Sequence, residues 1–279
     1  MKTAMLMTLM TLLLMVIGDF FGGLQGMTVM LVIGVVMNFF TYWNSDKMVL
    51  AHYNAKQVDR NSAPRLYGIV ERLAKKAQLP MPKVYIIDSP IPNAFATGRD
   101  PEHAAVAVNT ALADILDEDE LAGVLGHELS HVKHRDILIS TVAASMAGAI
   151  STIAQWGMFL GGGRDENGES RNPIAAVLVM LLAPLAAAMI QMAVSRSREY
   201  MADKSGGELC GDPNALASAL LKIEAFAKRR VMPGATEATA HMFIINPFSG
   251  VNMKQLFSTH PPTEERVRLL REQALAMHK

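Results

Sequence analysis

The sequence contains a single cysteine, Cys210, among 279 residues. One thiol excludes an intramolecular disulfide, which fits a reducing compartment for the polar part of the chain. It also excludes a zinc site built from several cysteines. Lys plus Arg and Asp plus Glu both number 26, so the formal net charge is zero and no positive excess favours nucleic acid. Internal repeats and low-complexity tracts are absent as well.

Hydrophobic residues make up 51% of the chain, which is high for a soluble enzyme, and they are concentrated in long runs. Each run is near or above the ~20 residues with which a helix crosses a bilayer. The four runs are 4–21, 27–43, 137–160 and 174–194. Lys2 before the first run also suits a signal peptide, but no small-x-small cleavage site follows and a second run comes at once. The later pair could instead be a buried helical hairpin lying on the polar domain.

The stretch from Asp117 to Arg135 is typical of one helix that carries half of a metal site. Asp117 and Glu120 form a capping-box pattern at its start, with acidic charge at the positive end of the helix. His127 and His131 are four residues apart, so both imidazoles project from one face about one turn apart. Two nitrogen ligands of one Zn²⁺ require this spacing.

Glu128 lies roughly 100° round the helix from His127, beside such a metal rather than on it. A carboxylate there can take a proton from water. By chance, a His-Glu-x-x-His match arises in roughly one such sequence in a hundred. The alternative is an ordinary amphipathic helix with two solvated histidines, and a third ligand would argue against it.

The compact metzincin spacing would need glycine at position 134 and histidine at position 137, where the sequence has His134 and Ile137. The third ligand must therefore come from elsewhere, as in the His₂Glu sites of thermolysin-like enzymes. Glu199 is the best candidate, because an out-and-back membrane hairpin would return it to the face that the chain left after His131. Asp203, one turn later, could accept the second N–H of a ligand histidine.

An alternative remains for this segment, since Arg196, Arg198 and Glu199 could form only a charged cap on the last apolar run. The turn at 22–26 is uncharged, and the loop at 161–172 has Arg164 and Arg171 against three acidic residues. Six other basic residues near the ends of the runs lie on the side of the polar segments. They are Lys2, Lys47, Lys133, Arg135, Arg196 and Arg198. The positive-inside rule then predicts that both termini and the polar segments are cytoplasmic.

Periodicity predicts helices over 67–77, 213–229 and 263–277, and strands over 83–87 and 104–108. The segment 93–98 pairs with the second strand in a hairpin. We therefore predict a mainly α, α+β fold: a thermolysin-like (gluzincin) zinc-helix domain with a small sheet, joined to about four transmembrane helices. The expected division is an N-terminal transmembrane hairpin (1–45), a first catalytic part with the zinc helix (46–136), a second transmembrane hairpin (137–194) and a second catalytic part (195–279).

Four motifs together resemble the signature stretches of the HtpX membrane metalloproteases, bacterial relatives of the CAAX prenyl endopeptidases. They are His127–His131, Asn93–Gly98, Ser195–Asp203 and Ser258–Pro262. The resemblance covers essentially the whole chain. It implies a zinc endopeptidase of the bacterial inner membrane that faces the cytoplasm, holds one Zn²⁺ per chain and acts in stress response and quality control of damaged membrane proteins.

On this interpretation His127, His131 and Glu199 hold Zn²⁺ and Glu128 is the general base. The strand at 93–98 would bind unfolded substrates as an added strand through Asn93, Ala94 and Ala96, although a plain hairpin strand is the alternative. His260 could stabilise the oxyanion, but ordering the turn into the last helix is the favoured reading.

A different class of protein also fits the sequence: a non-catalytic membrane scaffold or chaperone that contains zinc.

Overall fold

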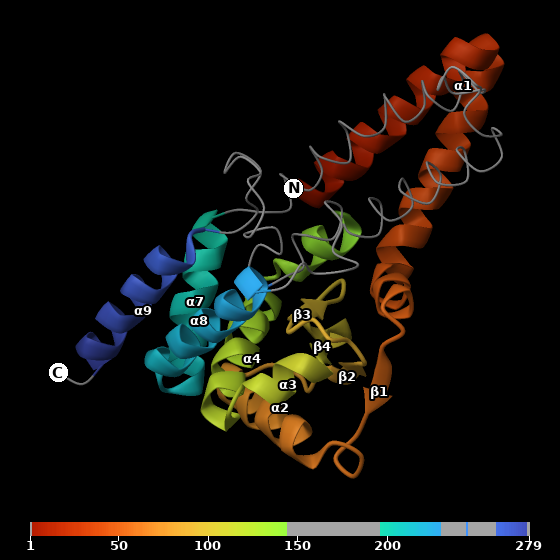
Figure 1. The fold of residues 1–279 in the computed structure, drawn as a ribbon. Helices are drawn as coiled ribbons and strands as arrows, with labels where there is room; N and C mark the ends of the chain where they lie inside the picture. The colour runs from red at the N-terminus through yellow and green to blue at the C-terminus, as the bar shows by residue number, and fades with distance from the viewer. Residues whose placement is uncertain (1, 144–195, 230–243, 245–260, 278–279) are drawn as a thin grey trace, which may run out of the picture.

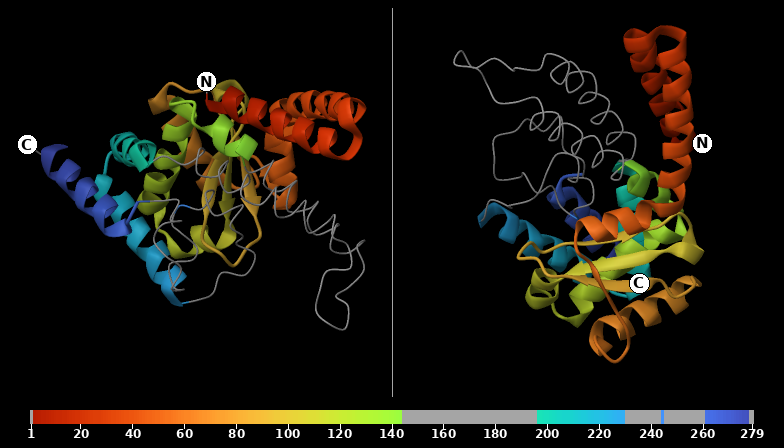
Figure 2. Two further views of the ribbon diagram at one scale, coloured as in Figure 1. Left: turned by 90° about the horizontal axis from the view of Figure 1, so that it is seen from above. Right: turned by 90° about the vertical axis from the view of Figure 1, so that its right-hand side faces the viewer.

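The computed structural model describes residues 2–143, 196–229, 244 and 261–277. Helix α1 (Lys2–His52) forms two arms that extend away from a body of sheet and helices (Figures 1 and 2). The arms meet at a kink, where Gly23 adopts a φ of 56°. Glycine enters this left-handed region without the steric penalty of a Cβ atom. The chain therefore reverses direction at the uncharged turn between the first two apolar runs.

The two arms pack closely through small and polar residues. A Cβ atom on Gly18 would lie 2.4 Å from the Gly26 carbonyl oxygen, and Asn38 Nδ2 donates to the Met7 carbonyl at 3.0 Å and to Thr11 Oγ1 at 2.8 Å. Contacts of this kind hold helices together in lipid, where apolar burial supplies no drive for association.

Within the described residues, one helix is long and apolar enough to cross a membrane: Gly22–His52, with a mean hydropathy of 1.7. Thr3–Val16 in the first arm is a shorter apolar helix. The first two predicted runs are thus helical, and the second helix continues to His52. Most of the last two runs, 137–160 and 174–194, lies outside the described residues, so the count of four spans stays a prediction.

The sheet has four strands in the order β1-β2-β4-β3, with β2 and β4 parallel and the two outer pairs antiparallel. The strands are β1 (Lys56–Val58), β2 (Lys83–Ile87), β3 (Ala94–Thr97) and β4 (Ala105–Asn109). The sequence correctly predicts β2 and the hairpin of β3 with β4, which passes through the short helix η1 (Pro101–His103). Strand β3 is an edge of the sheet, and this places it beside the site described below.

The two faces of β4 pack against different helices. Val106 and Val108 belong to the main core with α2 (Pro64–Ala77) and α4 (Glu118–Lys133). Ala105 and Ala107, which alternate with them, belong to a second cluster that includes Val49 and Leu50 near the end of α1. The small α3 (Thr110–Ile115) links β4 to α4. The sheet thus lies between the helical body and the C-terminal end of α1.

Helix α4 lies at the centre of the helical layer. It packs on α7 (Arg196–Cys210) and α8 (Pro213–Arg229), and α9 (Thr263–Met277) packs on both of these. Where α4 meets α7, a Cβ atom on Gly126 would lie 2.8 Å from the Gly206 carbonyl oxygen. The absence of side chains at both positions lets the two backbones approach, and this contact lies beside His127.

The zinc helix ends before Arg135, the residue to which it was predicted to extend. Helix α4 ends at Lys133, and Arg135 adopts a φ of 59°. The Asp136 N–H donates to the His131 carbonyl at 2.9 Å and the Arg135 N–H to the Val132 carbonyl at 3.1 Å. This pair of bonds is a Schellman turn, which satisfies the last carbonyls of a helix. Residues 137–143 are helical again in a new segment.

Candidate metal centre

The capping box predicted at the start of α4 is confirmed. Asp117 Oδ1 accepts the Glu120 N–H at 2.9 Å, and Glu120 Oε2 accepts the Asp117 N–H at 3.0 Å. Glu120 also accepts hydrogen bonds from Ser218 Oγ at 2.7 Å and Lys222 Nζ at 2.6 Å on α8. These bonds fix the start of α4 against α8. Because His127 and His131 are on the same helix, their positions relative to α8 are fixed as well.

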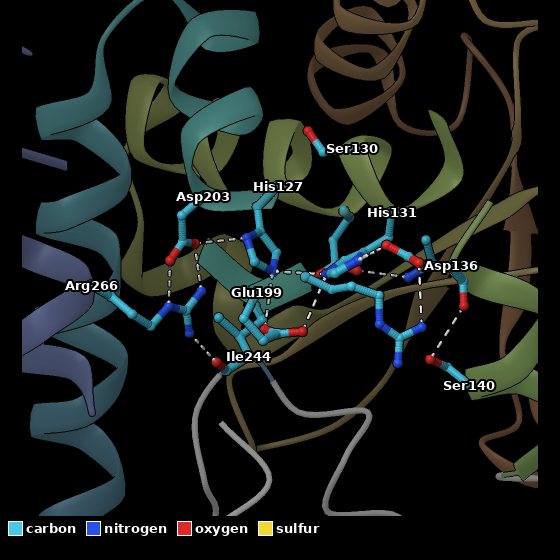
Figure 3. Close-up of polar contacts among 12 residues, drawn as sticks. His127, Ser130, His131, Asp136, Ser140, Glu199, Asp203, Ile244 and Arg266 are labelled. Atoms are coloured by element: carbon cyan, nitrogen blue, oxygen red, sulfur yellow. Dashed lines mark hydrogen bonds and ion pairs between the residues drawn. The ribbon is translucent and has the colours of Figure 1, made fainter. Parts of the chain in front are cut away.

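Three of the predicted side chains converge where α4 crosses α7 (Figure 3). The Nε2 atoms of His127 and His131 are 3.2 Å apart. Glu199 faces both, with Oε2 3.7 Å from His127 Nε2 and Oε1 3.6 Å from His131 Nε2. Glu199 thus lies beside both histidines, as predicted from the sequence.

The donor set suits a zinc ion. Ligand atoms of the three residues all lie within 4.8 Å of one another. Around a tetrahedral Zn²⁺ with ~2.05 Å bonds, neighbouring ligand atoms are about 3.3 Å apart, close to the separations seen here. Two imidazole nitrogens and one carboxylate are also the ligand types of catalytic zinc sites with an open fourth position.

His127 is oriented from behind by a carboxylate. Its Nδ1 lies 2.8 Å from Asp203 Oδ1, a close contact although not a well-directed hydrogen bond. Arg266 donates to both Asp203 oxygens at 2.7 Å and to the Ile244 carbonyl at 2.8 Å. Burial would raise the pKa of Asp203, but the guanidinium of Arg266 outweighs it and lowers that pKa to about 2. Asp203 is therefore a carboxylate throughout the physiological range.

His131 has a corresponding partner at its other nitrogen. Asp136 Oδ2 lies 3.6 Å from His131 Nδ1, and Arg198 Nη1 donates to Asp136 Oδ1 at 3.3 Å. Burial alone would lower the pKa of His131, but Asp136, Glu199 and Glu128 together raise it to about 9. The protonated ring carries a proton on each nitrogen. A metal ion that binds Nε2 must displace the Nε2 proton, because only the neutral ring offers a lone pair.

Glu128 is buried and contacts the sheet rather than the other donors. Its Oε2 accepts the Ala96 N–H of β3 at 2.9 Å. Burial raises the pKa of Glu128, while the neighbouring histidines and the Ala96 N–H act in the opposite direction. A carboxyl group with a raised pKa accepts a proton more readily at neutral pH, as a general base must.

Three other predicted residues lie at the start of β3 or within it. Asn93 is buried; its Oδ1 accepts the Ile244 N–H at 3.1 Å and its carbonyl accepts the Asn109 N–H at 2.9 Å. Ala94 is buried and Ala96 is half-buried beside Glu128. The role of Asn93, Ala94 and Ala96 in binding substrate stays a prediction. His260 lies outside the described residues.

Sequence reasoning missed Arg266 and Asp136. Arg266 is 1% exposed and shares the buried face of α9 with Leu270 and Ala274, at four-residue spacing. A charge on the apolar stripe of a helix was the available signal, because a buried arginine needs an acidic partner. For Asp136 no comparable signal existed, since its position depends on a helix end that lacks glycine.

The chain has clear relatives. A model of peptidase family M48 matches residues 60–274. A protein from Paraburkholderia phytofirmans named Protease HtpX homolog is 58% identical over 275 residues, which are 98% of this chain and 96% of the relative. A protein of the same name from Methylibium petroleiphilum is 59% identical over 272 residues, 97% of this chain and 96% of the relative.

Among solved structures, the crystal structure of S. mikatae Ste24p matches 93% of the chain with a TM-score of 0.51 and 20% identity. The chain spans 60% of the length of Ste24p. At this identity the likeness concerns the fold alone, and it agrees with the mainly helical fold and small sheet described above.

Proposed function

The chain belongs to peptidase family M48 and is a membrane metalloprotease, and from this we propose that it is a zinc endopeptidase acting on unfolded segments of membrane proteins. We place its catalytic domain on the cytoplasmic side of the bacterial inner membrane. One observation carries the proposal: the two histidine Nε2 atoms and Glu199 converge on one point, beside a carboxylate anchored to the sheet edge.

We assign His127, His131 and Glu199 as the ligands of one Zn²⁺. When bound, zinc supplies a Lewis acid that polarises a carbonyl group and makes a nearby water more acidic. Asp203 holds the ring of His127 from behind, so that Nε2 rather than Nδ1 faces the ligand cluster. Three of the four residues come from buried helix positions, which keeps the geometry rigid before substrate arrives.

Glu128 is the general base. Its Oε2 is held by the Ala96 N–H, and Oε1 is the atom that takes the proton from the attacking water. The same carboxyl group then gives that proton to the amine of the departing peptide. The raised pKa of Glu128 suits both transfers, because the group must bind and release a proton at the same pH.

Substrate binding at β3 follows from the alternation of its backbone. The Asn93 carbonyl accepts the Asn109 N–H of β4, whereas the Ala96 N–H donates to Glu128 on the other side of the strand. Because backbone groups alternate in direction along a strand, the N–H and C=O groups of Ala94 and Ala96 point to the open edge. Glu128 occupies the Ala96 N–H, which leaves carbonyl groups of this edge for a peptide that adds as a strand. Binding would depend on hydrogen bonds to the substrate backbone more than on its side chains. We therefore expect broad specificity for unfolded segments.

Metal-dependent proteolysis tests the proposal. The full-length protein, purified in detergent and loaded with zinc, should bind one zinc per chain and digest an unfolded protein such as casein. A chelator should abolish digestion and added zinc should restore it, because the proposed reaction needs a metal ion to polarise the scissile carbonyl group. Stoichiometric zinc without any digestion would favour the non-catalytic scaffold instead.

A further inference from the structure

Both histidines of the centre have a carboxylate at Nδ1, and both carboxylates have an arginine. Behind His127 lie Asp203 and Arg266, joined by two hydrogen bonds of 2.7 Å. His131 has Asp136 at 3.6 Å, and Asp136 in turn is bound by Arg198 at 3.3 Å. The second arrangement is looser, and its histidine and carboxylate are close together in the chain while Arg198 comes from α7.

The end of α4 determines where Asp136 lies. The Schellman turn at Arg135 directs the Asp136 N–H back to the His131 carbonyl, at 2.9 Å. The backbone of Asp136 is thus tied to the residue whose ring its carboxylate faces. A helix that continued straight past Lys133 would carry residue 136 about 7 Å along the axis from His131. The early end of the helix is what brings the carboxylate to the ring.

Arg198 connects this carboxylate to the other half of the centre. It precedes Glu199 on α7 and is separated from Asp136 by 62 positions. The side chains of Arg198 and Asp136 are 14% and 15% exposed. Charges shielded to this extent are less weakened by water and salt than a surface ion pair. The pair therefore links the end of α4 to the start of α7, across the two chain ends that flank the predicted membrane hairpin.

We propose that Asp136, held by Arg198, is a positioning residue for His131 that sets the zinc affinity of the centre. The proposal rests on the zinc site assigned above. The carboxylate favours the tautomer with a proton on Nδ1, which leaves the lone pair on Nε2 directed at the ligand cluster. Through Arg198, the same contact keeps the α4 ligands and the α7 ligand at a fixed separation.

Zinc affinity of the purified full-length protein, measured by competition with a chromophoric chelator in detergent, tests the role. Asp136→Asn should raise the zinc dissociation constant about 10- to 100-fold, the range for residues that orient a metal ligand. Arg198→Gln should raise it in the same direction by less. The double variant should add little to Asp136→Asn, because Arg198 acts through Asp136.

Matched controls come from the same molecule. Asp100 contacts His103 Nδ1 at 2.6 Å away from the centre, so Asp100→Asn removes an equivalent carboxylate from a histidine. Arg72 forms an exposed ion pair with Glu118 at 3.6 Å, so Arg72→Gln matches Arg198→Gln. Both controls should leave the zinc dissociation constant unchanged.

A lower thermal stability of metal-free Asp136→Asn with an unchanged zinc dissociation constant would overturn the proposal, since that is the result of a purely structural ion pair. If Asp136→Asn does not yield folded protein, Arg198→Gln decides in the same way: unchanged affinity rejects the proposal and weakened affinity supports it. Wild-type protein that binds no stoichiometric zinc would contradict the proposed function instead.

Discussion

Glu128 combines two features that a general base needs. Burial raises its pKa, and the hydrogen bond from the Ala96 N–H fixes one carboxylate oxygen beside the edge strand. The proposed metal ligands do not include it, so a change at this position should separate catalysis from metal binding. An amide of the same shape still accepts the Ala96 N–H but cannot take a proton.

Glu128→Gln should therefore keep one zinc per chain while reducing proteolysis at least ~10²-fold, the smaller end of what a general base contributes. Zinc content and casein digestion are measured on the same preparation. Glu118→Gln, an exposed acid in the first turn of the same helix, is the control and should digest at the wild-type rate. Undiminished digestion by Glu128→Gln would refute the assigned base.

Arg266 is the largest side chain that is fully buried in the described part of the protein. Replacing it by methionine keeps most of the apolar volume but leaves Asp203 as a buried carboxylate without its counter-charge. Removing one partner of a buried ion pair costs about 3–5 kcal/mol of folding free energy. Chemical unfolding in detergent should show a loss of this size for Arg266→Met.

Arg268, two positions along the same helix, supplies the contrast. It is 53% exposed and pairs with Glu265 and Glu272 on the surface. Surface pairs of this kind contribute little to stability, so Arg268→Gln should unfold at the wild-type denaturant concentration. Equal effects of the two variants would mean that Asp203 does not depend on Arg266.

At the scale of elements, the close approach of α4 and α7 decides whether Glu199 reaches the histidines. A Cβ atom on Gly206 would lie 2.6 Å from the His127 nitrogen and 2.8 Å from its Cα atom. These are backbone atoms that cannot rotate away, so a methyl group at this position must push the two helices apart. Because Glu199 is on α7 and His127 is on α4, the ligand separation should increase with the helix separation.

Gly206→Ala should consequently weaken zinc binding and cost about 1–3 kcal/mol of folding free energy, as overpacking does. Chelator competition and chemical unfolding measure the two effects. Gly68 is a helical glycine of α2 with no atom within 4 Å of an added Cβ. Gly68→Ala should stabilise the protein by roughly 0.5–1 kcal/mol without altering zinc binding. An unchanged zinc affinity in Gly206→Ala would show that the helix contact does not set the ligand separation.

For the whole molecule, β3 contacts both the candidate metal centre, through Glu128, and the end of α1. Tyr53 and Phe95 rings are 5.5 Å apart, and Arg99 lies 4.5 Å above the Trp43 ring. The C-terminal end of α1 is thus in contact with β3 and with the residues that follow it. A membrane surface at this end of α1 would lie close to the edge that we propose for substrate binding.

The proposed orientation can be tested by cysteine labelling in intact bacteria. In a Cys210→Ser background, Gln25→Cys at the tip of the arms should react with a membrane-impermeant maleimide added from outside. Asn61→Cys in the polar domain should react only after the inner membrane is opened, because it lies on the cytoplasmic side. Both native residues are exposed, so accessibility of the side chain itself does not limit labelling. The reverse pattern would place the catalytic domain outside the cytoplasm.

Much of the secondary structure depends on local sequence patterns and could therefore be predicted from the sequence. The alternation of β4 and the β-branched residues of β2 are local signals, and both strands were predicted within one residue. Strand β1 was missed, because a stretch of three residues with two exposed side chains carries no periodic signal. The parallel pairing of β2 with β4 joins strands that are not consecutive, which no local pattern specifies.

The sequence by itself determined the parts of the centre that one helix contains: the capping box, the two histidines on one face and the carboxylate of Glu128 between them. A helix fixes the relative positions of residues within a turn, so spacing is sufficient evidence there. Only the tertiary structure decided how Glu199, Asp136 and Arg266 meet those histidines. Their positions depend on the glycine contact between α4 and α7, on the early end of α4 and on the buried face of α9, and these arise from packing between segments distant in the chain.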